Sequence, residues 1–392
     1  MSKRSIKIQV EPAILKYARF CSGYTVVEAS KKLGIKEDVL TLYEDQKTEI
    51  TIPRLEKMAG VYKIPLAYFF LQEIPKDVVL PKDFRIIYAS EERNFSPPVM
   101  LAIRRARYIQ SVIQELSEHK LVYAFPKVTI TDDVDAVAAK FRSILGVEMD
   151  VQSKWHDPST SLRHWKEAIE KLQVYILQQS LPENQVSAFC LADQLPYIIV
   201  LNSSEDERPS RRIFSLFHEI GHILLHNSGV CTPDNLSRNS YQYIQIEKFC
   251  NQFAASVLVP KDDFLRNQYV RQLTQQPIAQ WSDDIVQSVS SYFGVSNEVI
   301  YRRFLTIGTI GERAYEQKRN ELIRGYEAYK NRKEGKRIEL RIPQYRKIIS
   351  KNGYAYSSII LENLHSNKIT MAEAADFLDT NSQHIPAVEL HL

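Results

Sequence analysis

Residues 211–226 have the sequence RRIFSLFHEIGHILLH, and this stretch decides the fold of the central part of the chain. Large apolar side chains recur in it at helical spacing and predict a largely buried helix; they are Phe214, Leu216, Phe217, Ile220, Ile223, Leu224 and Leu225. His218 and His222 are separated by about one helical turn, so both imidazoles point to one side and can bind the same Zn²⁺. A buried helix has little use for such polar groups unless they are paired or ligated.

Glu219 lies between the two histidines and is rotated away from them around the helix. A carboxylate in this position can take a proton from the attacking water and later deliver it to the leaving amine. The motif therefore has the H-E-x-x-H arrangement typical of metallopeptidases. One alternative is that the histidines are ordinary residues that bind nothing. Another is a transcriptional regulator or antitoxin whose zinc site is structural or latent, but Glu219 favours catalysis because a structural site needs no base.

A catalytic zinc usually has three protein ligands, and two positions near the motif are excluded. His226 would lie about 12 Å along the helix axis from His218, too far for one ion on a straight helix. A histidine six residues after His222 would complete a three-histidine site, but Ser228 occupies that position.

Glu247 is the best candidate for the third ligand. It belongs to an amphipathic helix predicted over residues 245–257, and two packed antiparallel helices would let its carboxylate face the histidines. Alternatively, Glu247 is a solvated helix charge. Asp234 is the second choice as ligand.

Four further side chains are candidates for subsidiary roles. Asn251 shares a helix face with Glu247 and can orient a metal ligand without itself binding the metal. His226 can interact with the C-terminal end of its helix dipole, or contact substrate. Tyr241 and Tyr243 can stabilise an oxyanion, although ordinary aromatic packing explains them equally well.

The whole chain has the composition of an ordinary globular protein. Its 392 residues suggest two to four domains, and a net charge of +4 implies no global attraction to nucleic acid. The cysteines are scattered, which excludes a disulfide framework and fits a reducing compartment. No apolar run approaches the roughly 20 residues of a membrane helix, and no apolar segment follows the basic N-terminus. We therefore expect a cytoplasmic protein that has no membrane partner.

The remaining segments are mostly helical in pattern. Thr25 and Glu28 form a capping box for a helix that ends at Gly34. The other expected elements are helices over about residues 36–44, 100–119, 131–146 and 160–171, and strands over 172–177 and 197–201. Residues 311–351 are rich in Lys, Arg and Tyr and suit single-stranded nucleic acid, but a solvated charged helix is the commoner explanation.

A second capping box is expected near the C-terminus. Thr370, Glu373, Ala374 and Leu378 repeat the spacing of residues 25, 28, 29 and 33. The repeat indicates either a second small helix-turn-helix-like unit or an ordinary capped amphipathic helix.

Residues 211–226 resemble the ImmA/IrrE metallopeptidases. Several separated segments share the resemblance in the same order: the strand ending Ile199–Asn202, the run Glu247–Ala255 followed by Leu258–Pro260, and the segments Ser291–Ser296 and Arg302–Phe304. The resemblance covers about residues 131–310 and implies that His218, His222 and Glu247 bind one Zn²⁺, with Glu219 as the base. It also implies a protease that cuts a repressor in a stress, phage or mobile-element switch. Phe217 departs from the family, in which alanine is commoner.

The N-terminal segment resembles the Xre/Cro-type helix-turn-helix, with residues 25–33 as its first motif helix and 36–44 as its recognition helix. The expected recognition helix is acidic on balance, since it offers Glu37, Asp38, Glu44 and Asp45. Carboxylates beside phosphates are unfavourable, so the domain is either a DNA reader or a surface for a protein partner or a homodimer. The candidate DNA-binding residues are Lys31, Lys32, Lys36, Thr41 and Tyr43.

These inferences predict an α+β, mostly α fold in four parts. They are a helical helix-turn-helix domain (1–80), a connector with a helix (81–130), a zincin-like metallopeptidase domain with a small β-sheet packed on the motif helix (131–310) and a basic helical C-terminal region (311–392). The expected partners are a protein substrate, which would be a helix-turn-helix repressor or a toxin encoded nearby, and DNA as a further candidate.

Overall fold

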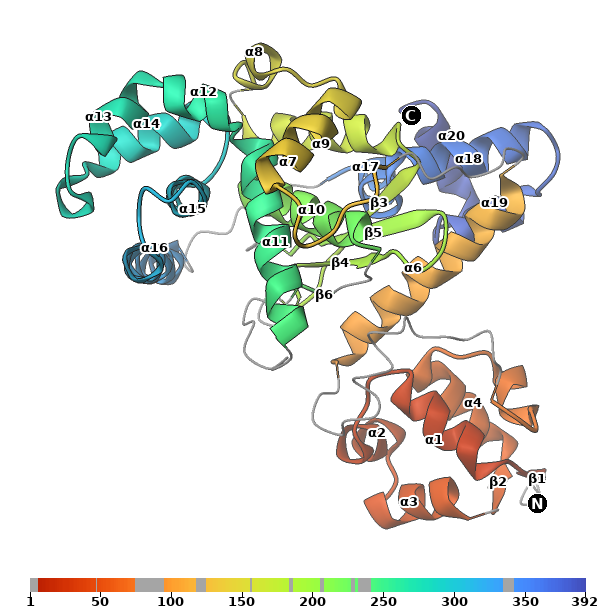
Figure 1. Cartoon of the computed structure of the whole chain (residues 1–392). Helices are drawn as coiled ribbons and strands as arrows, with labels where there is room; N and C mark the ends of the chain where they lie inside the picture. Colours follow the sequence, from red (N-terminus) through yellow and green to blue (C-terminus); the bar gives the residue numbers. More distant parts are fainter. Residues whose placement is uncertain are drawn as a thin grey trace. The chain divides into compact units, whose positions relative to one another are not determined.

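A computed structural model describes residues 6–46, 48–74, 95–117, 125–155, 157–182, 186–204, 208–226, 230–231, 241–333 and 342–392. The chain forms two compact units, residues 1–108 and 109–392, and each is described by itself (Figure 1). Helices predominate and the sheets are small, which confirms the predicted α+β, mostly α fold. Among the described residues, no helix is both long and apolar enough to cross a membrane. The expected division into four domains stays a prediction.

Unit 1 is a helical bundle with one small two-stranded sheet. Its elements are β1 (Lys7–Gln9), α1 (Pro12–Phe20), α2 (Val26–Leu33), α3 (Glu37–Asp45), β2 (Glu49–Thr51), α4 (Ile52–Tyr62), η1 (Leu66–Phe70) and the first part of α6 (Pro97–Leu116). Strands β1 and β2 pair antiparallel, with Ile8 opposite Ile50. The capping box of Thr25 and Glu28 is present, and Gly34 ends α2 in the left-handed conformation that glycine adopts without strain, so both predictions are confirmed.

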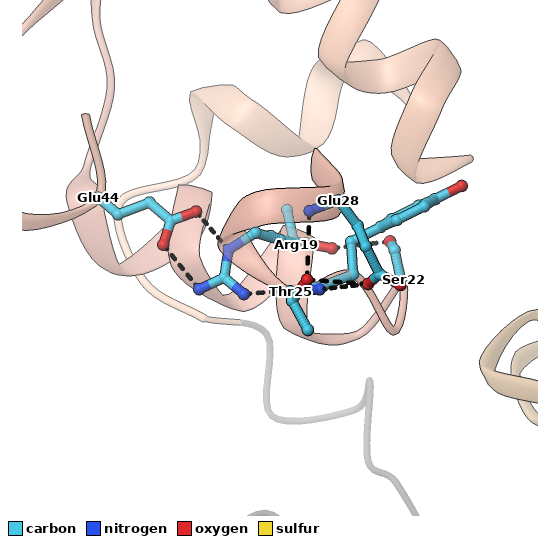
Figure 2. Close-up of polar contacts among 7 residues, drawn as sticks. Arg19, Ser22, Thr25, Glu28 and Glu44 are labelled. Carbon is cyan, nitrogen blue, oxygen red and sulfur yellow. Dashed lines mark hydrogen bonds and ion pairs between the residues drawn. The ribbon is translucent and has the colours of Figure 1, made fainter. Parts of the chain in front are cut away.

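A buried ion pair ties α1 to α3 in unit 1 (Figure 2). Arg19 Nε donates to Oε1 of Glu44 at 2.7 Å, and Arg19 Nη2 donates to Oε2 at 2.8 Å. The third guanidinium nitrogen, Nη1, donates to the carbonyl of Tyr24 at 2.8 Å. Such a bidentate pair fixes the angle between the two helices, because the planar guanidinium fits a carboxylate in one orientation only.

Unit 2 contains the central sheet and the remaining helices. In chain order they are the end of α6, α7 (Val134–Leu145), α8 (Met149–Gln152), α9 (Pro158–Glu170), β3 (Val174–Gln179), β4 (Ala188–Leu191), β5 (Tyr197–Asn202), α10 (Pro209–Leu224), β6 (Val230–Cys231), α11 (Tyr241–Leu258), α12 (Lys261–Arg266), α13 (Gln268–Thr274), η2 (Ile278–Gln280), α14 (Asp283–Phe293), α15 (Asn297–Thr306), α16 (Glu312–Lys333), α17 (Gln344–Asn352), α18 (Tyr354–His365), α19 (Met371–Phe377), η3 (Ser382–His384) and α20 (Ile385–Glu389).

The central sheet has the strand order β3-β5-β4-β6. Strand β5 pairs parallel with β3 and antiparallel with β4, and β6 pairs antiparallel with β4. Every residue of β4 and β5 is buried, as expected for strands covered on both faces. The strands predicted over 172–177 and 197–201 are confirmed as β3 and β5. The short strands β4 and β6 were not anticipated.

Helix α10, which carries the histidines, packs on β4 and β5 and against α7, α9 and α11. Phe217 fills the centre of this packing: its ring meets Trp165 edge-on at 4.8 Å and Phe141 at 6.5 Å between centroids. Phe141 in turn meets Phe253 of α11 at 5.5 Å. The bulk of Phe217 is therefore accommodated by an aromatic cluster behind the motif, and it does not intrude on the histidines.

The helices after residue 342 cover the outer edge of the central sheet. Helices α17 and α18 contact β3, and Gln178 Nε2 donates to the hydroxyl of Ser350 at 2.8 Å. Gly353, between the two helices, has φ 79°, and a Cβ atom there would collide with the carbonyl of Ile176. Glu170 accepts a backbone hydrogen bond from Ala355 in the first turn of α18. The second capping box, at Thr370 and Glu373, is present at the start of α19, as predicted.

Candidate metal centre

Helix α10 places the two motif histidines side by side. His218 and His222 are 2% and 1% exposed, and their Nε2 atoms lie 3.1 Å apart. The four-residue spacing on one helix face produces this arrangement directly. Two imidazole nitrogens at this distance, turned toward one point in a dry environment, form the start of a metal-binding donor set.

Glu247, on α11, completes a triangle of donor atoms with the histidines. Its Oε2 lies 3.4 Å from His218 Nε2, and its Oε1 lies 3.3 Å from His222 Nε2. In the described part of the chain these three residues form a group able to hold a metal ion, and all three are buried. Tetrahedral Zn²⁺ with bonds of about 2.0–2.1 Å separates its ligand atoms by about 3.3–3.4 Å. The triangle therefore has the size and the donor chemistry that Zn²⁺ requires.

Gly221 explains how α11 comes close enough to supply that carboxylate. A Cβ atom on Gly221 would lie 3.0 Å from the Cα of Cys250 and 3.1 Å from its Sγ, tighter than ordinary contacts. The absence of a side chain lets the two helix backbones approach, and Glu247 lies one turn before Cys250 on α11. The glycine of the motif is thus a packing residue, a role that the spacing of the histidines did not reveal.

Glu219 is fully buried beside the triangle but is not one of its three donors. Neither of its carboxylate oxygens has a hydrogen bond of normal geometry among the described residues, although the thiol of Cys190 on β4 is near enough to lower its pKa. A buried carboxylate without partners is costly. Its presence indicates that the site takes up a group that interacts with it.

Their surroundings shift the pKa of Glu219 and the pKa of Glu247 in opposite directions. Burial raises the pKa of Glu219, while His222 and His218 partly oppose this effect. Burial acts in the same sense on Glu247, but the close approach of His218 and His222 outweighs it and holds the pKa of Glu247 well below the usual range. Glu247 is therefore suited to remain ionised as a ligand and Glu219 to accept a proton, the division of roles expected of an acid/base pair.

The subsidiary candidates are less closely connected to the triangle. Asn251 is half-buried on α11. His226 is exposed just beyond the end of α10, in the left-handed conformation with φ 51°. Tyr243 is half-buried in the first turn of α11. Asp234 and the side chain of Tyr241 lie outside the described residues, so their proposed roles stay predictions.

In unit 1, the candidate DNA-binding residues Lys31, Lys32, Lys36 and Thr41 are exposed. Tyr43 is half-buried, and its hydroxyl accepts a hydrogen bond from Arg54 Nη1 at 3.1 Å.

Glu44 does not contribute to the acidic surface that the sequence suggested for α3. It is 5% exposed and paired with Arg19, 25 positions earlier in the chain. No local pattern signals a contact over that separation. DNA binding by this unit stays a prediction.

Comparison with known families supports the resemblance over the middle of the chain. Residues 169–305 match the family model described as Peptidase_M78, IrrE N-terminal-like domain. This match runs from the end of α9 to α15 and contains the two histidines, Glu219 and Glu247. No curated protein matches the chain. The match supports a metallopeptidase-type function for residues 169–305, which are similar to the IrrE N-terminal-like domain, while the helix-turn-helix assignment of unit 1 stays a prediction.

Proposed function

We propose that the protein is a zinc-dependent endopeptidase of the H-E-x-x-H type that cleaves one specific cytoplasmic protein. A repressor of the helix-turn-helix type, or a toxin encoded nearby, is the proposed substrate, and the cut would release a stress, phage or mobile-element response. One observation supports the activity above all: three buried donor atoms at zinc-binding separations with a second buried carboxylate beside them.

His218, His222 and Glu247 would hold the ion, and Glu219 would move the proton. When bound, Zn²⁺ would polarise the scissile carbonyl and lower the pKa of a water molecule. Glu219 then accepts the proton that the water loses as its oxygen forms a bond to the carbonyl carbon. The same carboxyl group returns that proton to the amide nitrogen as the carbon–nitrogen bond breaks. Raised basicity from burial suits Glu219 to both steps.

The main alternative is a regulator or antitoxin in which zinc is structural. Structural zinc sites are usually closed by four protein ligands, whereas catalytic sites keep one position open. The described residues supply three donors, and Glu219 lies beside these donors but is not one of them. These features favour an open, catalytic site.

The test compares wild type with Glu219→Gln and Glu247→Gln. We expect Glu219→Gln to retain one zinc per chain by elemental analysis while cleavage of the adjacently encoded repressor or toxin falls by about 10²–10⁴-fold. Glu247→Gln should lose the metal itself. Either of two results would exclude the proposed activity. One is undiminished cleavage by Glu219→Gln, and the other is a metal-loaded wild type that does not cleave the repressor or toxin encoded nearby.

A further inference from the structure

Arg302, on α15, lies against the helix face that carries the metal-binding histidines. Phe214, His218 and His222 follow one another at four-residue intervals along that face of α10. The guanidinium carbon of Arg302 lies 5.4 Å from the ring centre of Phe214, and the rings of Phe214 and His218 are 6.5 Å apart. Arg302 therefore extends the metal-binding face by one turn toward the N-terminus of α10.

The guanidinium of Arg302 is held in place from two sides. Its guanidinium also lies over the ring of Tyr315 of α16, with 5.1 Å between the guanidinium carbon and the ring centre. Its Nη2 donates to Oε1 of Glu298 at 3.2 Å, one turn earlier on α15. A planar cation that contacts two rings and a carboxylate loses little further entropy on binding, because its orientation is already restricted.

This cation is only partly neutralised. The same oxygen of Glu298 also accepts hydrogen bonds from the Tyr315 hydroxyl at 3.2 Å and from Arg319 Nε at 3.3 Å. Two guanidinium groups thus share one carboxylate. The side chain of Arg302 is 18% exposed, and its Nε and Nη1 atoms have no hydrogen-bond partner among the described residues. A positive charge with open donors remains beside the metal centre.

The adjacent Arg303 shows what a purely structural arginine looks like here. Arg303 is 0% exposed and donates to Asp135 at 2.6 Å and to Ser256 at 2.7 Å, which links α15 to α7 and α11. Arg302 is less buried, and its only side-chain hydrogen bond among the described residues goes to Glu298, on its own helix. Its position is that of a group prepared to bind an external acceptor.

We propose that Arg302 is a specificity-determining residue that binds a carboxylate of the substrate near the scissile bond. The guanidinium can be no farther from the His218 ring than the two connecting distances together, about 12 Å, and an extended chain spans about 3.3–3.6 Å per residue. The substrate therefore has an Asp or Glu within about three residues of the cleaved bond. This inference deepens the proposed peptidase function and rests on it.

Peptide hydroxamates provide a test that needs no turnover, because the hydroxamate group binds zinc directly. Matched fluorescent probes carry either Glu or Gln at the first, second or third residue from the hydroxamate. Their affinities for the zinc-loaded full chain are measured by anisotropy. At one position at least, the Glu probe should bind roughly tenfold more tightly, the size of a charge-assisted hydrogen bond net of desolvation.

Substitutions assign the preference to one side chain. Arg302→Gln should reduce the Glu-to-Gln affinity ratio to about one, and Arg302→Glu should favour a Lys probe. Arg319→Gln is the matched control and should keep the ratio, since Arg319 also donates to Glu298 but it is Arg302 that lies over the Phe214 ring. If Arg302→Gln does not fold by circular dichroism, Arg302→Lys replaces it and should lower the ratio at least threefold, because lysine lacks the planar fork.

Three results would contradict the proposed role of Arg302. Equal binding of Glu and Gln probes at all three positions, a ratio that survives Arg302→Gln, or no binding of any probe to the zinc-loaded chain would overturn the assignment. Probes that bind with the expected ratio to a protein that cleaves no candidate substrate would refute the peptidase proposal and leave the carboxylate site standing.

Discussion

Gly221 sets the spacing between α10 and α11, the two helices that form the candidate metal centre. Because a Cβ atom there would press on the backbone of α11 at Cys250, Gly221→Ala should push α11 and its carboxylate away from the histidines. We expect a loss of about 1–3 kcal/mol in the free energy of unfolding and a zinc affinity lower by roughly tenfold or more. Competition with a fluorescent chelator measures the affinity.

Gly325→Ala is the control for this substitution. Gly325 is also helical, and nothing lies within 4 Å of its added Cβ. Alanine should stabilise α16 by up to about 1 kcal/mol and leave zinc binding unchanged. Equal zinc affinities for wild type and Gly221→Ala would show that helix spacing does not limit the site.

The Arg19–Glu44 pair in unit 1 is a second residue-scale test. Glu44→Ala leaves a buried guanidinium without its carboxylate and should destabilise unit 1 by about 3–5 kcal/mol. The double replacement Arg19→Met with Glu44→Leu removes both charges and should be close to neutral. Hydrogen exchange of peptides from residues 6–74 reports the stability of this unit. Glu37→Ala, at an exposed position of α3, should change it by no more than about 0.5 kcal/mol.

At the scale of elements, Glu170 joins the end of α9 to the start of α18. Burial raises the pKa of Glu170 to about 7, with Lys166 and backbone hydrogen bonds from Ala355 and Ile176 opposing the shift. The folded state therefore holds a proton that the unfolded state releases near pH 4.5. The contribution of Glu170 to the free energy of unfolding is largest below pH 4.5. It falls as the pH rises toward 7 and stays constant at higher pH.

Glu170→Gln should remove this dependence, because the amide cannot ionise. Its melting temperature should match wild type at pH 4.5 and exceed it at pH 8, by the equivalent of about 1–3 kcal/mol. Thermal scans from pH 4.5 to 8.5 measure the difference. If the difference in melting temperature between Glu170→Gln and wild type stays constant over this range, the ionisation of Glu170 does not contribute to folding stability.

The elements also differ in how far the sequence predicts them. The histidine pair and both capping boxes depend on neighbours three or four positions away, so local spacing predicts them correctly. Strand β4 is only four residues long, is buried on both faces and has no alternating pattern, so no periodicity marks it. The Arg19–Glu44 pair and the position of Arg302 depend on contacts between helices that are distant in sequence, so no local sequence pattern predicts them.

At the scale of the whole molecule, unit 2 depends on its C-terminal helices. Removing residues 342–392 would uncover the edge of β3 that α17 and α18 contact. An open, apolar strand edge is a template for aggregation, so we expect the truncated protein to form large assemblies in light scattering and to lose zinc binding. Lys351→Ala, which removes only an exposed ion pair with Asp379, should behave like wild type. A monomeric, zinc-binding truncation would show that the C-terminal helices are dispensable.

The contact between Gln178 and Ser350 joins positions 172 residues apart. At about 5–20 residues per second, a ribosome needs roughly 10–30 seconds to pass from one to the other. During that interval α10 and α11, the helices of the candidate metal centre, are made after β3, but the helices that cover the β3 edge are not yet complete. The edge of β3 therefore stays uncovered during synthesis until α17 and α18 have been made.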